Sequence, residues 1–411
     1  MIVLFEDSRA RGFEPIALTR HVSHLLVGAH ALRARVERAF AGEAITLHGR
    51  AAIMRYHGGK GERVERPGET ALFVNARALM TGALATRLRA TGEWILRQGD
   101  AVVAARLESA SIARLAWDRD ALDFDALEGI ASTSIDDARL YDWVWDLIAD
   151  NGERLVADFE ERGAANEGTV MPGAMLVAGD RIAIGRGAVV RTGAILDATD
   201  GPITIDDGAE VMPGAVIEGP CHIGQGSRVK IGAKIYGQTS IGPACKVGGE
   251  IENSIILGFS NKQHDGFLGH SYLGAWVNLG ADTNTSDLKN NYGRIRVTLD
   301  GVEIDTGRMF LGALIGDHSK TGINTMLNTG TIIGVAANVF GGGFPSKSIP
   351  SFSWGGSDGF ETFRLDRALE LARTVMARRS VELTAADEEL LAGIAASTTN
   401  TRTDSITTEN R

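Results

Sequence analysis

The chain has 411 residues, of which 44% are hydrophobic and 23% charged, and a formal net charge of −10 at pH 7. This balance is typical of a globular protein rather than a disordered or fibrous one, and the length predicts two or three domains. The acidic balance argues against a nucleic-acid surface, although it leaves room for local basic pockets that hold phosphates. The 51 glycines against 9 prolines favour a repetitive turn architecture, because glycine adopts positive φ without strain.

The sequence carries no signal for export or for a membrane span. Residues 1–8 contain Glu6 and Asp7 instead of a basic segment followed by an apolar stretch. No run approaches the roughly 18 apolar residues of a membrane span. The two cysteines, Cys221 and Cys245, cannot form a disulfide framework and lack metal-ligand spacing, so we expect buried thiols and no metal site. These features predict a cytoplasmic protein.

The first third of the chain alternates between strand-like and helix-like segments. Apolar runs at residues 1–7, 44–49 and 71–76 predict strands, and residues 21–40 carry an apolar stripe at helical spacing. This alternation predicts an α/β domain over residues 1–140. Residues 139–163 predict one or two helices, within a linker at 141–168.

A strict period of six follows the linker. Small residues and glycines separate the aliphatic positions, which predicts a parallel β-helix over residues 169–345 with three six-residue units per coil and the aliphatic side chain inside. The positions are Ile184, Val190, Leu196, Ile205, Val211, Ile217, Ile223, Val229, Ile235, Ile241 and Val247, then Phe267, Leu273 and Leu279, then Ile315, Thr321, Leu327, Ile333 and Val339.

Two interruptions of this period, at residues 253–266 and 285–310, leave the solenoid as loops. Such loops commonly carry function, although they can also be tolerated surface insertions. After the repeats, residues 346–411 predict C-terminal helices, one over 361–379 and one beginning near Leu383, where Thr384 and Asp387 form a capping box. The polar stretch 405–411 is expected to be a frayed, flexible tail.

Residues 261–293 collect side chains that a β-helix core does not need. His264 or His270 could act as a general base, and Asn278 could orient a substrate or stabilise an oxyanion. The alternative is that they are ordinary surface residues of solenoid turns. Four basic residues could hold a phosphate: Lys262, Lys289, Arg294 and Arg296.

This segment resembles the acetyltransferase half of the family of bifunctional N-acetylglucosamine-1-phosphate uridyltransferases and glucosamine-1-phosphate acetyltransferases. Laid without gaps, the family motif H-x-x-Y-L-G followed by V-N-[IL]-G-A-G-T places its histidine on His264, its tyrosine on Phe267 and its second part on residues 277–283. This alignment keeps Phe267 inward, so His264 is the preferred base and His270 the second choice.

The chain departs from the family pattern around the expected acceptor site. Phe267 lacks the tyrosine hydroxyl, and the acceptor need not be glucosamine-1-phosphate. The family's Asn-Tyr pair falls on Asp287 and Leu288, with Asn291 and Tyr292 nearby, its lysine falls near Glu252, and its arginine falls near Lys234 and Arg228.

The N-terminal segment resembles the start of a divergent sugar-nucleotidyltransferase domain. The G-x-G-T-R loop that cradles nucleotide phosphates in ordinary members is missing. Arg9, Arg11 and Arg20 could contact the phosphates instead; alternatively the domain is degenerate and no longer transfers nucleotides.

Together the resemblances imply a left-handed β-helix, a homotrimer with sites shared between subunits, and acetyl-CoA lying past residues Ala313 to Lys320. The implied activity is acyl transfer to an amino-sugar phosphate or nucleotide sugar, in sugar-nucleotide or cell-envelope biosynthesis. One alternative is a sugar-1-phosphate nucleotidyltransferase that uses Mg²⁺ and an NTP, with a structural or regulatory β-helix. Another is a non-enzymatic oligomerisation module that binds a nucleotide sugar.

Overall fold

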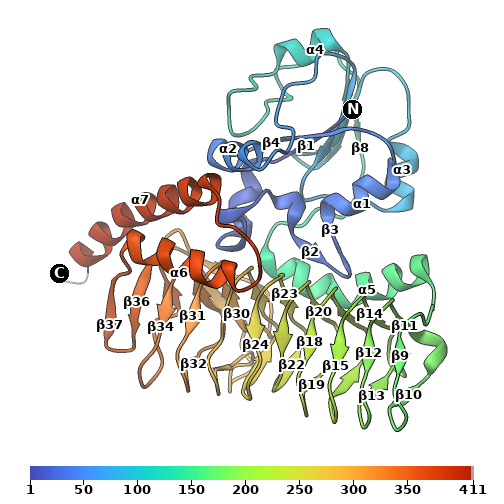
Figure 1. Ribbon diagram of the computed structural model, residues 1–411. Coiled ribbons are helices and arrows are strands. Elements are labelled where there is room, and N and C mark those ends of the chain that lie inside the picture. Colours follow the sequence, from blue (N-terminus) through green and yellow to red (C-terminus); the bar gives the residue numbers. More distant parts are fainter. Residues whose placement is uncertain (409–411) are drawn as a thin grey trace. The chain divides into compact units, whose positions relative to one another are not determined.

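Figure 1 shows the computed structural model, which describes residues 1–408, with side chains described through residue 398. The chain forms two compact units. The first comprises residues 1–25, 30–143 and 384–393, and the second comprises residues 26–29, 144–383 and 394 onward. Within the described residues, no helix combines the length and the apolar character needed to cross a membrane.

The first unit is built on a six-stranded sheet of order β4-β1-β5-β7-β6-β8. Strand β1 (Ile2–Phe5) lies parallel to both β4 (Ile45–His48) and β5 (Ala71–Asn75). Ile2 and Leu4 enter one buried cluster and Val3 and Phe5 another, so the strand reads as a continuous apolar run because both faces are covered. The remaining strands are β6 (Trp94–Gln98) and β7 (Ala101–Leu107), which are antiparallel neighbours, and β8 (Ser132–Ser134).

Short helices accompany this sheet and confirm the α/β prediction: α1 (Leu32–Ala39), α2 (Ala51–Gly59), α3 (Gly82–Arg87) and α4 (Ser109–Arg114). The helical prediction for residues 21–40 holds only for α1. The part before it is a 3₁₀ turn (Val22–His24) and two short strands, β2 (Leu26–Val27) and β3 (His30–Ala31). Gly28 lies between these strands with φ of 68°, a conformation that breaks a helix.

The second unit is a left-handed parallel β-helix with three faces, which Figure 1 shows as a row of stacked coils. The first face is one nine-stranded sheet. Its strands are β11 (Ile182–Ile184), β14 (Ile203–Ile205), β17 (Cys221–Ile223), β20 (Thr239–Ile241), β23 (Ile255–Ile256), β26 (Tyr272–Leu273), β30 (Ala313–Ile315), β33 (Thr331–Ile333) and β35 (Ser348–Ile349).

The second and third faces complete each coil. The second face holds β9 (Thr169–Val170), β12 (Val189–Val190), β15 (Glu210–Val211), β18 (Arg228–Val229), β21 (Lys246–Val247), β24 (Asn261–Lys262), β31 (Lys320–Thr321), β34 (Asn338–Val339) and β36 (Ser353–Gly356), with β37 (Gly359–Thr362) antiparallel to β36. The third face holds β10 (Met175–Val177), β13 (Ile195–Asp197), β16 (Val216–Glu218), β19 (Lys234–Ile235), β22 (Glu250–Glu252) and β25 (Phe267–Gly269), and the pair β27 (Asn284–Thr285) and β32 (Met326–Leu327).

The repeated aliphatics point into the prism, as the period of six predicts. From Ile184 to Val247 each lies in one continuous buried cluster, and Leu273 and Leu279 join it. The expectation for Phe267 is wrong. Leu268 fills the inward position opposite Ile251, and Phe267 faces outward opposite Glu250. Leu273 follows Leu268 by five positions instead of the usual six, so the phase of the repeat shifts by one residue at this point.

Helix α5 (Val144–Arg162) covers the first face. Two outward side chains of that face, Ser240 and Tyr272, are fully buried. Asn151 of α5 accepts a hydrogen bond from Ser240 Oγ at 2.9 Å, and Tyr272 Oη bonds the backbone of Leu26. The single long helix fulfils the prediction for residues 139–163.

The C-terminal helices are α6 (Leu365–Ala377) and α7 (Ala385–Thr408). Thr384 and Asp387 form the predicted capping box: Thr384 N donates to Asp387 Oδ2 at 2.7 Å, and Asp387 N donates to Thr384 Oγ1 at 3.4 Å. Of the tail that was predicted to fray, residues 405–408 continue α7, and residues 409–411 lie outside the described chain.

Candidate functional site

His270 and Asp287 form a hydrogen-bonded pair where the third face turns into the first. His270 follows β25 with φ of 43°, and its Nδ1 lies 2.8 Å from Oδ2 of Asp287. Asp287 comes two residues after β27, at the point where the long insertion leaves the solenoid. The insertion is fixed to the same corner, because Gly312 N donates to His270 O at 3.0 Å and Leu311 N donates to Asp287 O at 2.9 Å.

Two phenylalanines flank this pair. The ring of Phe310 stacks on the imidazole of His270 at 4.9 Å with 25° between the planes, and its side chain is 44% exposed. Phe267 lies over Gly269, where a Cβ would come within 2.5 Å of its ring and 2.3 Å of Asp287 Oδ2. Only glycine at position 269 leaves room for both neighbours, so the local sequence Phe-Leu-Gly-His shapes the site.

The pairing determines what His270 can do. A carboxylate accepts the proton of Nδ1, which fixes the neutral tautomer with a lone pair on Nε2. Within the described residues no hydrogen bond to Nε2 of His270 is present, and the side chain is partly exposed. The site can therefore take a proton from a bound acceptor group.

The structure separates the three residues that were expected to be catalytic. His264 is exposed in the turn between the second and third faces, and no side-chain hydrogen bond of His264 occurs among the described residues. Asn278 lies on the second face, between Asn261 and Lys320. His270 is at a different corner. The geometry favours His270 over His264, because only His270 has a carboxylate that orients it.

Lys262 is an inward residue, although it was expected to hold a phosphate. It is 2% exposed, and its Nζ donates to His264 O at 2.7 Å and Gly248 O at 3.2 Å. Burial lowers the pKa of its ammonium to about 8, against the partial opposition of nearby carboxylates. Its role is to join two turns of adjacent coils.

Other expected substrate-binding residues lie in the insertion. Lys289 Nζ donates to Arg294 O at 2.7 Å, and Asn291 Oδ1 accepts from Gly293 N at 3.0 Å. Tyr292 is 67% exposed, and Arg294 is exposed too. Arg296 lies in the hairpin of β28 (Arg296–Leu299) and β29 (Val302–Asp305) and pairs with Glu303 at 2.8 Å.

The remaining expected residues occupy three environments. Arg228 and Lys234 pair with Glu210 and Glu250 at 2.8 and 3.7 Å. Ala313, expected to line the cofactor groove, is instead a fully buried residue of the prism interior. Lys320 donates to His318 O at 2.8 Å, and burial lowers its pKa to about 8.

A cavity of about 410 Å³ opens in the first unit beside the ends of β1 and β6. Arg9 lines it together with Asp7 and Arg77. Arg77 is nearly buried and bridges Asp7 Oδ2 at 2.9 Å and Asp142 Oδ1 at 2.8 Å. The carboxyl ends of β1 and β5 meet at this edge, which is where α/β sheets usually bind ligands.

Arg11 and Arg20, the other two expected nucleotide contacts, do not line this cavity. Arg11 is exposed. Arg20 donates to Ile16 O and Thr19 Oγ1 within its own loop. The loop after β1 is held by a buried pair, in which Arg50 donates to both Glu6 oxygens at 2.9 Å.

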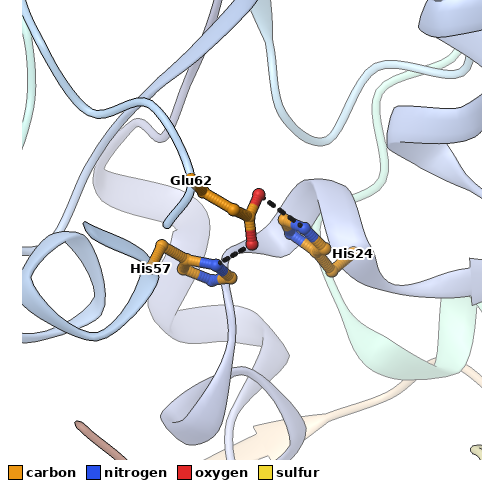
Figure 2. Close-up of side chains that lie close together, drawn as sticks. All are labelled: His24, His57 and Glu62. Carbon is orange, nitrogen blue, oxygen red and sulfur yellow. Dashed lines mark hydrogen bonds and ion pairs between the residues drawn. The ribbon is translucent and has the colours of Figure 1, made fainter. Parts of the chain in front are cut away.

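His24, His57 and Glu62, shown in Figure 2, are metal-ligand types whose ligand atoms lie within 4.8 Å of one another. His57 Nε2 accepts the His21 N–H at 3.1 Å, so its Nδ1 carries the proton that it donates to Glu62 at 2.6 Å. Arg33 also donates to Glu62. Burial opposes ionisation of Glu62, but bonds from His24 and His57 hold its pKa far below the ordinary value. This network of hydrogen bonds and ion pairs explains why the three side chains lie close together, without a metal ion.

Sequence reasoning missed Asp287 and Phe310 as partners of His270, and Asp7 and Arg77 as cavity residues. The sequence does carry a signal that Asp287 is the partner of His270. His270 lies two residues after inward Leu268, and Asp287 lies two residues after buried Thr285. Equal offsets on successive coils stack such residues directly.

Comparisons with known proteins find one matching family model and several similar sequences. A family model described as sugar nucleotidyl transferase matches residues 2–165. The bifunctional sugar-1-phosphate nucleotidylyltransferase/acetyltransferase of Sulfurisphaera tokodaii is 34% identical over 151 residues, 36% of this chain and 38% of that protein. The bifunctional protein GlmU of Methanococcus maripaludis is 38% identical over 85 residues, 21% of this chain and 20% of that protein.

A solved UDP-N-acetylglucosamine acyltransferase aligns with 53% of this chain and 78% of its own at 15% identity and a TM-score of 0.27, which is too low to bear on function. The chain spans well under half of the length of the two bifunctional relatives. Residues 2–165 thus match a sugar nucleotidyl transferase domain, and the chain resembles bifunctional nucleotidylyltransferase/acetyltransferases.

Proposed function

We propose that the β-helix transfers an acyl group from acetyl-CoA to the amine of an amino-sugar phosphate or nucleotide sugar. The observation that carries this proposal is the His270–Asp287 pair, with Nδ1 and Oδ2 2.8 Å apart at a partly exposed corner. A histidine oriented by a carboxylate and otherwise free at Nε2 is suited to general-base catalysis. The name of the relative from Sulfurisphaera tokodaii includes an acetyltransferase activity, which supports the same chemistry.

In the proposed reaction the acceptor amine attacks the thioester carbonyl as Nε2 of His270 takes one proton from the amine. The new C–N bond forms, the C–S bond breaks, and the imidazolium returns its proton to the departing thiolate. Asp287 stabilises the imidazolium without itself becoming protonated. Phe310 stacks on the imidazole and holds its plane, and Phe267 packs against Gly269 beside the pair.

Acyl transfer is tested by following thiol release with acetyl-CoA and a panel of amino-sugar phosphates and nucleotide amino sugars. We expect release that depends on the acceptor, and we expect His270→Ala to lower it by about 100-fold or more. A circular-dichroism melt establishes that the variant is folded. Release that is absent, or unchanged in folded His270→Ala, would contradict the proposal.

We also propose that the chain works as a homotrimer. Apolar side chains project at the corner between the second and third faces, with Ile231 68% and Ile323 71% exposed, as expected for a surface that a neighbour covers. Light scattering during size-exclusion chromatography tests the mass, and a monomer would contradict this part.

The first unit supports a second candidate function, nucleotidyl transfer from an NTP to a sugar-1-phosphate. The specific observation is the cavity with Arg9 at the carboxyl end of β1, within the range that matches the sugar nucleotidyl transferase model. Incubation with sugar-1-phosphates, an NTP panel and Mg²⁺ should release pyrophosphate, and Arg9→Ala should reduce the rate. Absence of pyrophosphate with every NTP would favour a degenerate domain.

A further inference from the structure

Five basic side chains gather where the C-terminal end of α6 meets the second face of the β-helix. They are Arg228, Lys230, Lys246, Arg378 and Arg379, named here the basic cluster. Arg228 and Lys246 are register partners on β18 and β21, so their Cα atoms lie one strand spacing apart. Lys230 is beside Gly248, where a Cβ would be 3.1 Å from the Lys230 Cβ. The cluster is therefore formed by adjacent coils and one helix.

Hydrogen bonds fix the guanidinium of Arg379 within this cluster. Its Nη1 donates to Ala244 O at 3.0 Å, and its Nη2 donates to Asn261 Oδ1 at 2.9 Å. A guanidinium has five N–H donors, so several remain for a ligand. Its location after the last turn of α6 is favourable, because the C-terminal end of a helix dipole attracts cations. The protein thus pays the ordering cost of this arginine before any ligand binds.

The cluster lacks matching carboxylates. Arg228 pairs with Glu210 at 2.8 Å, but Lys230, Lys246 and Arg378 make no ion pair with any residue that the structure describes. Partial burial lowers the pKa of Lys246, and repulsion from Arg379, Arg228, Lys230 and Arg378 lowers it further. In a chain of net charge −10, a group of unbalanced cations stands out as an attractive surface for anions.

We propose that the basic cluster binds the diphosphate group of a nucleotide-type ligand. Two adjacent phosphates suit the two rows of cations, one from the coils and one from the end of α6, and the arginine forks can bind phosphate oxygens in pairs. The diphosphate could belong to a coenzyme A molecule or to a nucleotide sugar. Binding at this surface does not depend on the acyl-transfer proposal, because none of the five side chains belongs to the His270 corner.

Isothermal titration of the full chain with inorganic pyrophosphate at low salt tests this site. The probes coenzyme A and UDP-N-acetylglucosamine distinguish the two sources of the diphosphate. We expect wild-type binding that weakens with added salt and a loss of about tenfold or more in Lys246→Ala/Arg378→Ala. The matched control is Arg367→Ala on the same helix, which removes one exposed cation that pairs with Glu370 at 3.1 Å; its affinity should equal that of wild type.

Binding that is absent in wild type, or equally weakened in the control and the double variant, would overturn the proposal. Single variants Lys230→Ala and Lys246→Ala give a second readout, each expected to weaken binding by several-fold. Thiol release with acetyl-CoA separates the two proposals. If the double variant loses pyrophosphate binding but the wild type shows no acyl transfer, this site stands and the proposed function fails. If the wild type transfers acyl groups but does not bind pyrophosphate, the proposed function stands and this site fails.

Discussion

Nδ1 of His270 lies 2.8 Å from Oδ2 of Asp287, and these residues come from successive coils, with Asp287 at the point where the insertion departs. The contact links a solenoid corner, which is rigid, to the first residues of a long loop. A catalytic pair built this way is positioned by the β-helix, and the loop supplies the neighbouring side chains.

Asp287→Asn should lower acyl transfer at least about tenfold while the fold is retained. The amide no longer stabilises the imidazolium and can favour the wrong tautomer of His270. Asp287→Glu should recover part of the activity, because it restores the charge. Steady-state kinetics with both variants check this, and a drop confined to KM for the acceptor would contradict an orienting role.

Gly269→Ala should reduce activity with only a modest loss of stability. The added Cβ would lie 2.3 Å from Asp287 Oδ2 and 2.5 Å from the Phe267 ring, so the carboxylate must move away from His270. Gly342→Ala is the control, because a Cβ there meets nothing within 4 Å. Melting temperatures and rates of both variants are compared; equal rates would show that the carboxylate position is unimportant.

The stability of the β-helix should rise with pH between about 8 and 10.5 through Lys262. Burial lowers its folded pKa to about 8 from 10.5, so the unfolded chain binds more protons in this window and unfolding becomes harder as pH rises. Lys320 contributes in the same direction. Urea unfolding at pH 7.5 and pH 10.5 should show that the free energy of unfolding of the wild type gains on the order of 1–3 kcal/mol from Lys262 at the higher pH. Lys262→Met should lack this gain. Identical pH dependence in both proteins would refute this.

Both cysteines should be unreactive in the native protein. Cys221 and Cys245 are free and fully buried, and burial raises the pKa of Cys245 to about 12, so almost no thiolate is available at neutral pH. A colorimetric thiol reagent should label them only after denaturation. Fast labelling of the native chain would show that the coils around them open readily.

The period of six predicted the β-helix because each inward position tolerates only small or aliphatic side chains. It could not fix the phase near Phe267, because two neighbouring apolar residues, Phe267 and Leu268, both fit the pattern. The interior position before them is occupied by Lys262, which breaks the aliphatic series. The spacing from inward Leu268 to inward Leu273 is five residues instead of six, which returns the later coils to the expected register. A family motif laid without gaps cannot show this irregularity. It therefore places Phe267 inward and selects His264.

The chemistry of the site was only partly readable from sequence. His270 was named as a second candidate, but its partner follows from the stacking of successive coils. The equal offsets of His270 and Asp287 can be counted only once Leu268, and not Phe267, is known to point inward. In the first unit, Arg9 was expected at a ligand site and lines a cavity. Its neighbour Arg77 was not expected, since residues 68 positions apart meet only through the pairing of β1 with β5.

The most direct test of the proposed mechanism compares acceptor-dependent thiol release in His270→Ala and His264→Ala under identical conditions. We expect the rate to fall about 100-fold or more in His270→Ala and to stay within about threefold of wild type in His264→Ala. The opposite ranking, with both variants folded, would show that the histidine without a carboxylate partner is the base and would contradict the assignment made from the structure.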